Sequence, residues 1–175
     1  MRRPSSSSKQ TAAAADPKTV EAAAVRLLAR REHSVEELRR KLERKGYPPE
    51  SIESVIQKLA GKRLVSDERF TSNFVHHHAR RGQGPVRIRA ALRQQGVSDA
   101  QVEEALQSAD VDWVQLAREV RRRKFGSSAP RSLGERAKQA RFLQYRGFDA
   151  EQLRSALREE SGEGDGAPDI TLEAE

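Results

Sequence analysis

The sequence has 175 residues, of which 34 % are charged and 35 % are hydrophobic. An average globular chain has about 25 % charged residues and, with glycine counted, about 45–50 % apolar residues, so these values disfavour a single deep core. Cysteine is absent, which excludes disulfide bridges, thiolate metal sites and cysteine nucleophiles and is consistent with a reducing cytoplasm.

Residues 1–15 come before the first helical pattern. They contain Arg2, Arg3, a run of four serines and a run of four alanines, but not the apolar core of a secretory signal peptide. We expect a disordered leader here; a transit peptide is the alternative, since such segments are rich in Arg and Ser. No apolar run in the sequence approaches the ~18 residues that span a bilayer. The sequence therefore predicts a soluble, cytoplasmic protein.

Helical patterns fill the rest of the chain up to residue 159. Asp16 followed by Pro17 is typical of a helix N-terminus, Ser34 with Glu37 fits a capping box, and Gly46 fits a left-handed helix end. No segment alternates polar and apolar residues as a strand does. The nine predicted helices cover about residues 16–31, 34–46, 49–60, 67–81, 85–95, 99–109, 111–124, 131–146 and 150–159.

The helices form an internal repeat. Gly46, Gly96 and Gly147 each end an amphipathic stretch, at spacings of 50 and 51 residues. Four further columns keep the same register, and their members are Leu42, Leu92 and Leu143; Ile52, Val102 and Leu153; Val55, Ala105 and Ala156; and Ile56, Leu106 and Leu157. We therefore predict an all-α fold of three tandem three-helix repeats in an elongated, bent rod.

The repeat and the composition suggest five segments. They are a disordered leader (1–15), three three-helix repeats (16–65, 66–110 and 111–158) and an acidic, disordered tail (159–175). The tail carries seven acidic and no basic residues, so residues 1–158 have 33 Lys and Arg against 19 Asp and Glu, a net charge of +14. A body of this charge attracts polyanions, because neutralising phosphates releases condensed counterions.

Three clusters of basic residues are the candidate contact sites for a polyanion. Several of their members could instead pair with acids such as Glu43, or compensate helix C-terminal dipoles. The candidates are Arg39, Arg40, Arg44 and Lys45, with Lys41 beside them; Arg80, Arg81, Arg87, Arg89 and Arg93; and Arg121, Arg122, Arg123 and Lys124. Aromatic residues amount to only 5 %, which disfavours base stacking. We expect Tyr47, Trp113, Tyr145 and Phe148 to be packing residues.

Other motifs do not indicate catalysis or a cofactor. His76, His77 and His78 are consecutive, whereas a helical metal pair needs i, i+4 spacing, so a polar helix face is favoured over a metal site. Residues 82–85 (Gly-Gln-Gly-Pro) lack the Gly-Lys-Ser/Thr ending of a phosphate loop. No nucleophile, base and orienting group can be assembled from the sequence. We therefore expect a non-enzymatic protein with no metal or cofactor.

Residues 66–96 resemble the central signature of the RecX family, whose members regulate the bacterial recombinase RecA. The resemblance lies in Asp67-Glu68-Arg69-Phe70, Phe74-Val75, Arg80, the Gly-x-Gly-Pro turn at 82–85, Arg87-Ile88, Leu92 and Gly96. Residues 33–47 and 142–157 are similar to the family's opening and closing repeats, so the match covers about residues 18–158. Thr71 and the three histidines at 76–78 depart from the usual pattern.

The resemblance implies a cytoplasmic modulator that binds in the groove of the RecA–single-stranded-DNA filament. Such a protein suppresses ATP turnover, strand exchange and co-protease activity, and acts in DNA repair, homologous recombination and the SOS response. We expect sequence-independent contact with single-stranded DNA, no membrane contact and a monomer. The alternatives are a free-standing nucleic-acid-binding protein and a solenoid-type adaptor between proteins.

Overall fold

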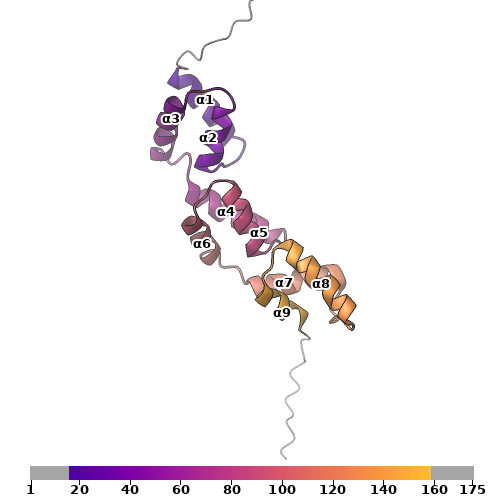
Figure 1. The fold of residues 1–175 in the computed structure, drawn as a ribbon. Helices are drawn as coiled ribbons and strands as arrows, with labels where there is room; N and C mark the ends of the chain where they lie inside the picture. Colours follow the sequence, from indigo (N-terminus) through magenta and orange to yellow (C-terminus); the bar gives the residue numbers. More distant parts are fainter. Residues whose placement is uncertain (1–15, 159–175) are drawn as a thin grey trace, which may run out of the picture.

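The computed structural model describes residues 16–158, and this part of the chain consists of helices and their connections, without a strand. Figure 1 shows an elongated, bent rod, which confirms the predicted fold class. The helices are α1 (Pro17–Leu28), α2 (Val35–Glu43), α3 (Pro49–Gly61), α4 (Asp67–Arg80), α5 (Pro85–Gln94), α6 (Asp99–Gln107), α7 (Trp113–Phe125), α8 (Leu133–Arg146) and α9 (Ala150–Leu157). The predicted leader and acidic tail lie outside the described residues.

Side-chain caps fix where most helices begin. Asp16 and Asp112 each accept a hydrogen bond from a main-chain N–H in the first turn of α1 and α7, and Ser66 does so at α4. Ser98 and Asp149 form complete capping boxes at α6 and α9. Such a cap stabilises a helix by about 1 kcal/mol.

The predicted capping box of Ser34 and Glu37 is only half formed. The hydroxyl of Ser34 accepts from the N–H of Glu37 at 3.0 Å, but the Glu37 carboxylate binds the Arg31 guanidinium instead of the Ser34 N–H. The pairing of Ser132 with Glu135 is incomplete in the same way, because the Glu135 carboxylate accepts from the N–H of Arg131 at 2.8 Å. In both cases the glutamate carboxylate accepts from a donor outside the capping box, which is the Arg31 guanidinium for Glu37 and the main-chain N–H of Arg131 for Glu135.

Each group of three helices, called a unit here, has its own apolar core. Leu38, Leu42, Ile52 and Leu59 are fully buried in the first unit (α1–α3), and Ile88, Leu92 and Val102 in the second (α4–α6). The third unit (α7–α9) has a smaller core around Leu143. The repeated apolar columns of the sequence thus correspond to the centres of three separate cores.

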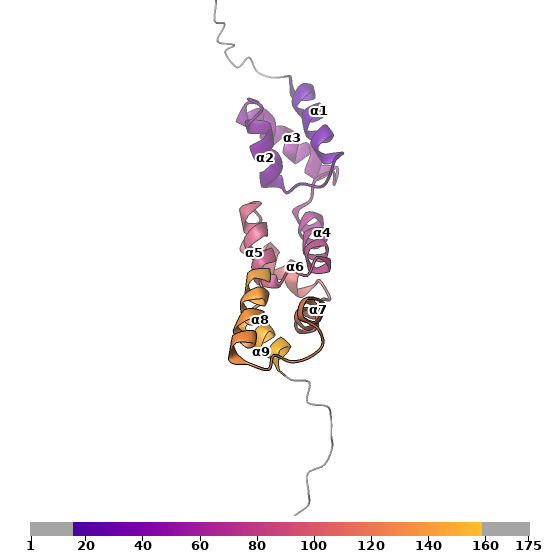
Figure 2. The same cartoon turned by 90° about the vertical axis from the view of Figure 1, so that its right-hand side faces the viewer.

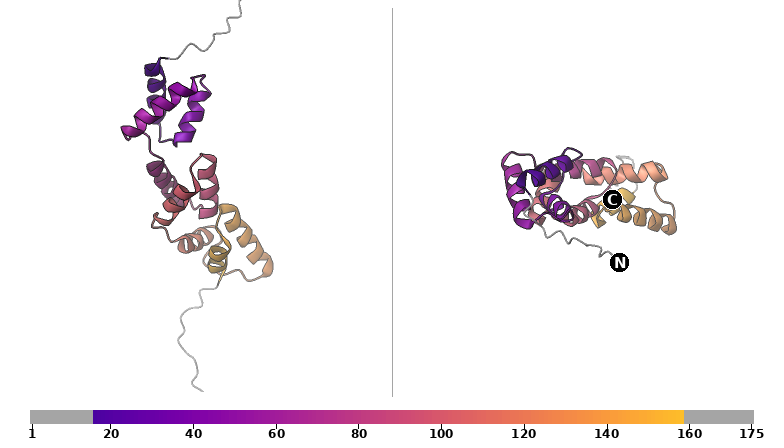
Figure 3. Two further views of the ribbon diagram at one scale, coloured as in Figure 1. Left: turned by 60° about the vertical axis from the view of Figure 1, so that its left-hand side comes forward. Right: turned by 90° about the horizontal axis from the view of Figure 1, so that it is seen from above.

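The units follow one another along the rod. In each unit the most extensive packing joins the first and third helices, and all of the extensive helix pairs lie within a unit. In Figure 2, α2, α5 and α8 succeed each other along one side, while α1, α4 and α7 lie along the other. The two further views in Figure 3 keep the same succession of units. Contact between units is therefore confined to their ends.

Between the first and second units, the end of α5 meets the start of α2. The hydroxyl of Ser34 donates to the carbonyl of Gln95 at 2.6 Å, and the guanidinium of Arg40 donates to the carbonyl of Gln94 at 3.0 Å. A Cβ atom on Gly96 would lie 2.2 Å from the side chain of Glu36. The glycine at the end of α5 therefore allows this close approach.

The end of α8 meets the start of α5 in the equivalent way. The N–H of Gly84 donates to the carbonyl of Arg146 at 2.9 Å, and the N–H of Val86 donates to the carbonyl of Gly147 at 3.0 Å. A Cβ on Gly84 would lie 2.3 Å from the Gly147 oxygen, and one on Gly147 would lie 2.3 Å from the Cβ of Arg87. The Gly-Gln-Gly-Pro turn thus serves as a main-chain joint between units.

We predict that Leu92→Ala lowers the free energy of unfolding by about 2–5 kcal/mol, because it leaves a cavity in the core of the second unit. Since the cores are separate, hydrogen exchange should lose protection mainly in the second unit. The control is Leu64→Ala, whose side chain is 48 % exposed and should change stability by only about 0.5 kcal/mol. Equal losses from the two substitutions would contradict the assignment of Leu92 to a core.

A second prediction distinguishes the loss of stability caused by a clash at the joint from the loss caused by the left-handed backbone of glycine. Gly46 and Gly147 both have positive φ, +82° and +91°, but a Cβ on Gly46 would meet nothing within 4 Å. Alanine at either position should cost roughly 1–2 kcal/mol through the left-handed backbone. Gly147→Ala should cost about 1–3 kcal/mol more through its clash with α5. Thermal denaturation of both variants measures the difference, and equal shifts would argue against a close-packed joint.

Candidate polyanion-binding groove

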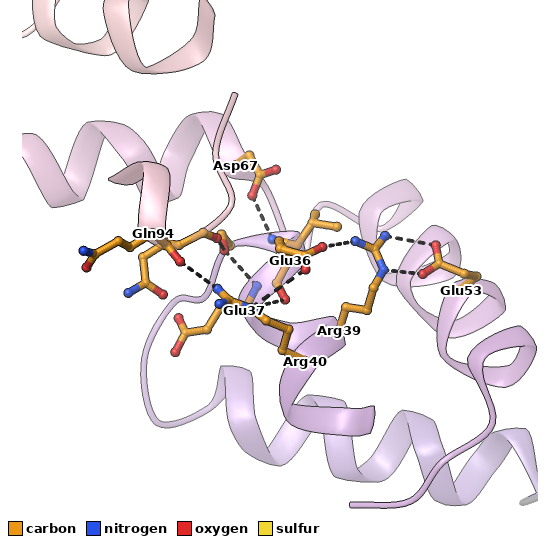
Figure 4. Close-up of polar contacts among 10 residues, drawn as sticks. Glu36, Glu37, Arg39, Arg40, Glu53, Asp67 and Gln94 are labelled. Carbon is orange, nitrogen blue, oxygen red and sulfur yellow. Dashed lines mark hydrogen bonds and ion pairs between the residues drawn. The ribbon is translucent and has the colours of Figure 1, made fainter. Parts of the chain in front are cut away.

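Four of the thirteen candidate basic residues pair with a carboxylate within their own units, and for Arg40 the partner is Glu36, at 3.8 Å. Arg39 binds the carboxylates of Glu36 and Glu53, as Figure 4 shows. Arg89 pairs with Glu103 at 2.5 Å, and Arg93 pairs with Asp99 at 2.6 Å. Hydrogen bonds to these acids raise the pKa of Arg39 and of Arg89 above the ordinary arginine value.

The pairs formed by Arg39 and Arg89 are equivalent, since each joins the second helix of a unit to the third across 14 residues. Arg39 and Arg89 therefore hold the second and third helices of their units together. They are less suited to binding a partner than their sequence clusters suggest.

The position of Arg121 contradicts its prediction as a contact residue. Its side chain is only 6 % exposed, because it lies on the inner face of α7 and turns toward the loop before α8. The guanidinium donates to the carbonyls of Ser128 at 2.9 Å and Ser127 at 3.2 Å. Arg121 therefore holds this loop in place, and its buried side chain is not available to bind a partner.

Arg40 and the remaining candidates are at the surface, with Arg122 half-buried. Arg40 is exposed on α2 and donates to the carbonyl of Gln94, while Arg44 and Lys45 are exposed directly after the helix, where Arg44 donates to the carbonyl of Arg40. Arg80 and Arg87 are exposed at the end of α4 and on α5. These side chains remain available in the free protein, but they are spread over two units.

One place in the described chain gathers exposed cations from two predicted clusters. Arg81, from the end of α4, lies beside Arg123 and Lys124 of α7 and Arg146 of α8, where the second and third units meet. These four residues, with Gly82, Val120 and Phe142, line a cavity of about 130 Å³ that we call the junction groove. No acidic residue lines it.

Arg146 lies outside the predicted clusters, and the structure gives it a fixed position. Its guanidinium donates to the carbonyl of Arg81 at 3.2 Å and lies 5.2 Å from the ring centre of Phe142. The only sequence signal is its place directly before the repeat glycine, where the second unit has Gln95. That position faces the preceding unit, so its charge contributes to the groove.

The joint between the first and second units has an equivalent groove of different chemistry. His77 and His78 of α4 occupy the positions that Arg123 and Lys124 occupy in α7, each 46 residues later, and they line a larger cavity of about 540 Å³. Its other lining residues include Phe70, Phe74, Arg31, Glu32, Glu37 and Gln95. With two carboxylates and two aromatic rings, this groove does not favour an anion.

Within this second groove, burial lowers the pKa of His78, which favours the neutral imidazole. The ring stacks on Phe74 with centroids 4.0 Å apart and bonds to the side chain of Gln83 at 2.8 Å. His76 instead bonds to the carbonyl of Ser72 at 2.8 Å. Across residues 16–158, no group of three His, Cys, Asp or Glu residues is arranged to hold a metal ion.

The expected packing role of the aromatic residues is correct for some and wrong for one. Phe148 is buried in the third core, and Tyr47 and Trp113 pack against the first and second cores. Tyr145, however, is 74 % exposed, because it lies on the outer face of α8. The guanidinium of Arg87 lies 5.3 Å from its ring centre and donates to its carbonyl at 3.1 Å.

Comparison with known proteins gives consistent matches along the chain. Residues 22–59, 66–106 and 110–157 match the family models described as the first, second and third three-helix domains of RecX. A protein named regulatory protein RecX from Halorhodospira halophila is 48 % identical over 144 residues, covering 82 % of this chain and 89 % of the relative. Its namesake from Pseudomonas savastanoi pv. phaseolicola is 42 % identical over 147 residues, covering 84 % and 95 %.

Solved structures show the same fold. The crystal structure of RecX from Lactobacillus salivarius matches with a TM-score of 0.71 and 21 % identity, over 82 % of this chain and 96 % of that chain. A second crystal structure, of a regulatory protein RecX, matches with a TM-score of 0.66 over 79 % and 70 %. None of the described helices is long and apolar enough to cross a membrane.

Substitutions of Arg121 and Arg123, which lie two residues apart on α7, should distinguish a structural arginine from a surface arginine. Arg121→Met should lower the free energy of unfolding by about 1–3 kcal/mol, because the hydrogen bonds of the buried, charged guanidinium to the carbonyls of Ser127 and Ser128 are lost. Arg123→Met should stay within about 0.5 kcal/mol of the parent chain, since its side chain is exposed. Urea denaturation measures both, and a stable Arg121→Met variant would return Arg121 to the contact candidates.

Proposed function

This chain belongs to the RecX family, and on that basis we propose that it is a non-enzymatic regulator that binds the RecA–single-stranded-DNA filament. Binding inhibits the filament's ATPase, strand-exchange and co-protease activities. The protein acts in the cytoplasm as a monomer, within homologous recombination, DNA repair and the SOS response. The observation that carries the proposal is the junction groove, a cluster of three exposed cations and the half-buried Arg146 at a joint of an elongated rod.

The charges of the groove support binding to phosphates. Arg81, Arg123, Lys124 and Arg146 form no ion pair with any described residue, so a phosphodiester does not have to displace an acid. Each phosphate that they neutralise releases condensed counterions from the nucleic acid, which favours binding whatever the base sequence. Arg80 and Arg87 lie exposed on the neighbouring α4 and α5 and extend the basic surface.

The shape of the molecule supports binding to a filament rather than to an isolated short site. The units follow one another along the rod, and exposed basic residues occur on the first unit (Arg44, Lys45) as well as at the second joint. A rod with contacts at several points can follow a helical surface and span several of its subunits. The lining of the groove offers positive charge without a nucleophile beside a base, which suits a binding role.

The alternative is a free-standing nucleic-acid-binding protein, which the charge of the rod alone would also support. The two functions differ in their preferred target. A filament regulator should lower DNA-stimulated ATP hydrolysis by the recombinase at concentrations where naked single-stranded DNA is little bound. A plain DNA binder should require saturation of the DNA itself before hydrolysis falls.

We predict that the double variant Arg123→Gln, Lys124→Gln binds single-stranded DNA more weakly than the parent chain. The slope of log affinity against log salt should fall in magnitude by about 2, one for each phosphate that is no longer neutralised. Fluorescence anisotropy of a labelled oligonucleotide over a series of salt concentrations measures this. The variant should also lose inhibition of the recombinase ATPase.

The matched control is Arg26→Gln, Arg30→Gln, which removes the same charge from exposed positions at the end of α1 and just after it. This control should change the affinity much less, because only the long-range field is altered. Equal losses in both double variants would contradict a local role for the groove. Full inhibition of the ATPase by the groove variant would contradict the proposed function.

A further inference from the structure

The junction groove gathers four cations, and no acidic residue lines it. Several other arginines of the described chain are paired with carboxylates, as Arg39 is with Glu53, Arg89 with Glu103 and Arg69 with Glu32. The acids missing from the groove are abundant in one segment outside the described residues. Residues 159–175 contain seven Asp and Glu and no Lys or Arg.

The position where this segment leaves the described chain brings the groove within its reach. The guanidinium of Arg136 donates to the carbonyl of Leu157 at 3.4 Å, so the end of α9 lies against α8. Arg146 is ten residues further along α8, which corresponds to roughly 15 Å of helix. Seventeen residues of extended chain span up to roughly 56 Å, nearly four times the length of that part of α8, so the segment can reach the groove.

From this charge complementarity and reach we infer that residues 159–175 bind the junction groove of their own chain and compete there with polyanions. The chemistry recognised is a run of carboxylates, which meets Arg81, Arg123, Lys124 and Arg146 as phosphates would. Because the segment is covalently attached, its effective concentration at the groove is on the order of millimolar, so weak individual contacts suffice. The inference rests on the proposed function only for the identity of the displaced ligand.

The same charges predict how the contact responds to salt. Exposed ion pairs contribute little individually and are screened over about 10 Å at 0.1 M salt. The acidic segment should therefore occupy the groove at low ionic strength and leave it as salt rises. A nucleic acid, with a higher and more regular charge density, should displace it.

The first experiment locates the segment without any nucleic acid. Since the chain has no cysteine, Ala167→Cys provides a single attachment site for a nitroxide spin label. At low salt, amide signals of residues around Gly82, Arg123 and Arg146 should broaden, while those around Lys45 should not. Broadening confined to residues next to Arg158, or spread equally over all basic surfaces, would overturn the inference.

A mixture of spin-labelled chains and separate isotope-labelled chains distinguishes contact within one chain from contact between two. We expect no broadening in the mixture. If broadening of the groove appears there as strongly as in the single chain, the acidic segment binds a second copy, and the proposed intramolecular contact is wrong.

The second experiment measures competition. A chain ending at Arg158, and a full chain with all seven acids of the segment changed to amides, should both bind single-stranded DNA roughly three- to tenfold more tightly than the parent at low salt, converging as salt screens the charges. The same truncation in the Arg123→Gln, Lys124→Gln background should give little gain. Superimposable curves for the truncated and full chains at low salt would overturn the competition. If none of these chains binds DNA, the proposed function fails, while the spin-label result still decides where the segment lies.

Discussion

The structure depends on the close contact that the end of each later second helix (α5 or α8) makes with the start of the second helix of the preceding unit. At the joint of the second and third units, the N–H groups of Gly84 and Val86 donate to the carbonyls of Arg146 and Gly147, and no side chain intervenes. Such an approach requires that Cβ atoms be absent at Gly84 and Gly147. Because this contact sets one unit directly on the next, it also brings the end of α4, α7 and α8 together, and thereby creates the junction groove.

Much of the fold could be predicted because its signals are local and occur three times. The glycines that end α2, α5 and α8 and the apolar columns beside them define the period, and Ser98 and Asp149 mark helix starts through caps that need only three residues. The capping box at Ser34 could not be predicted correctly, because its outcome depends on Arg31, a competing donor for the Glu37 carboxylate.

The candidate site could be predicted only in part, because its charges depend on contacts between residues that lie far apart in the sequence. A run such as Arg121, Arg122, Arg123 and Lys124 shows that α7 is basic, but consecutive helical residues point about 100° apart, and only the packed structure shows which of them is buried. Likewise, the ion pairs of Arg39 and Arg89 join different helices, and the approach of Arg146 to Arg81 spans 65 residues. Tyr145 lies close to a repeat glycine, as Phe148 does, yet the helix turns it outward.

The position of the junction groove between two units has a mechanical consequence. Arg81 belongs to the second unit, whereas Arg123, Lys124 and Arg146 belong to the third, and the units share no extensive helix packing. Tilting one unit on the other therefore changes the spacing of the cations, so the curvature of the rod and the charge pattern of its groove cannot vary independently. A bound polyanion with a fixed phosphate spacing would in turn select one curvature, and ligand binding would stiffen a joint that is otherwise held by a few hydrogen bonds from main-chain and arginine donors.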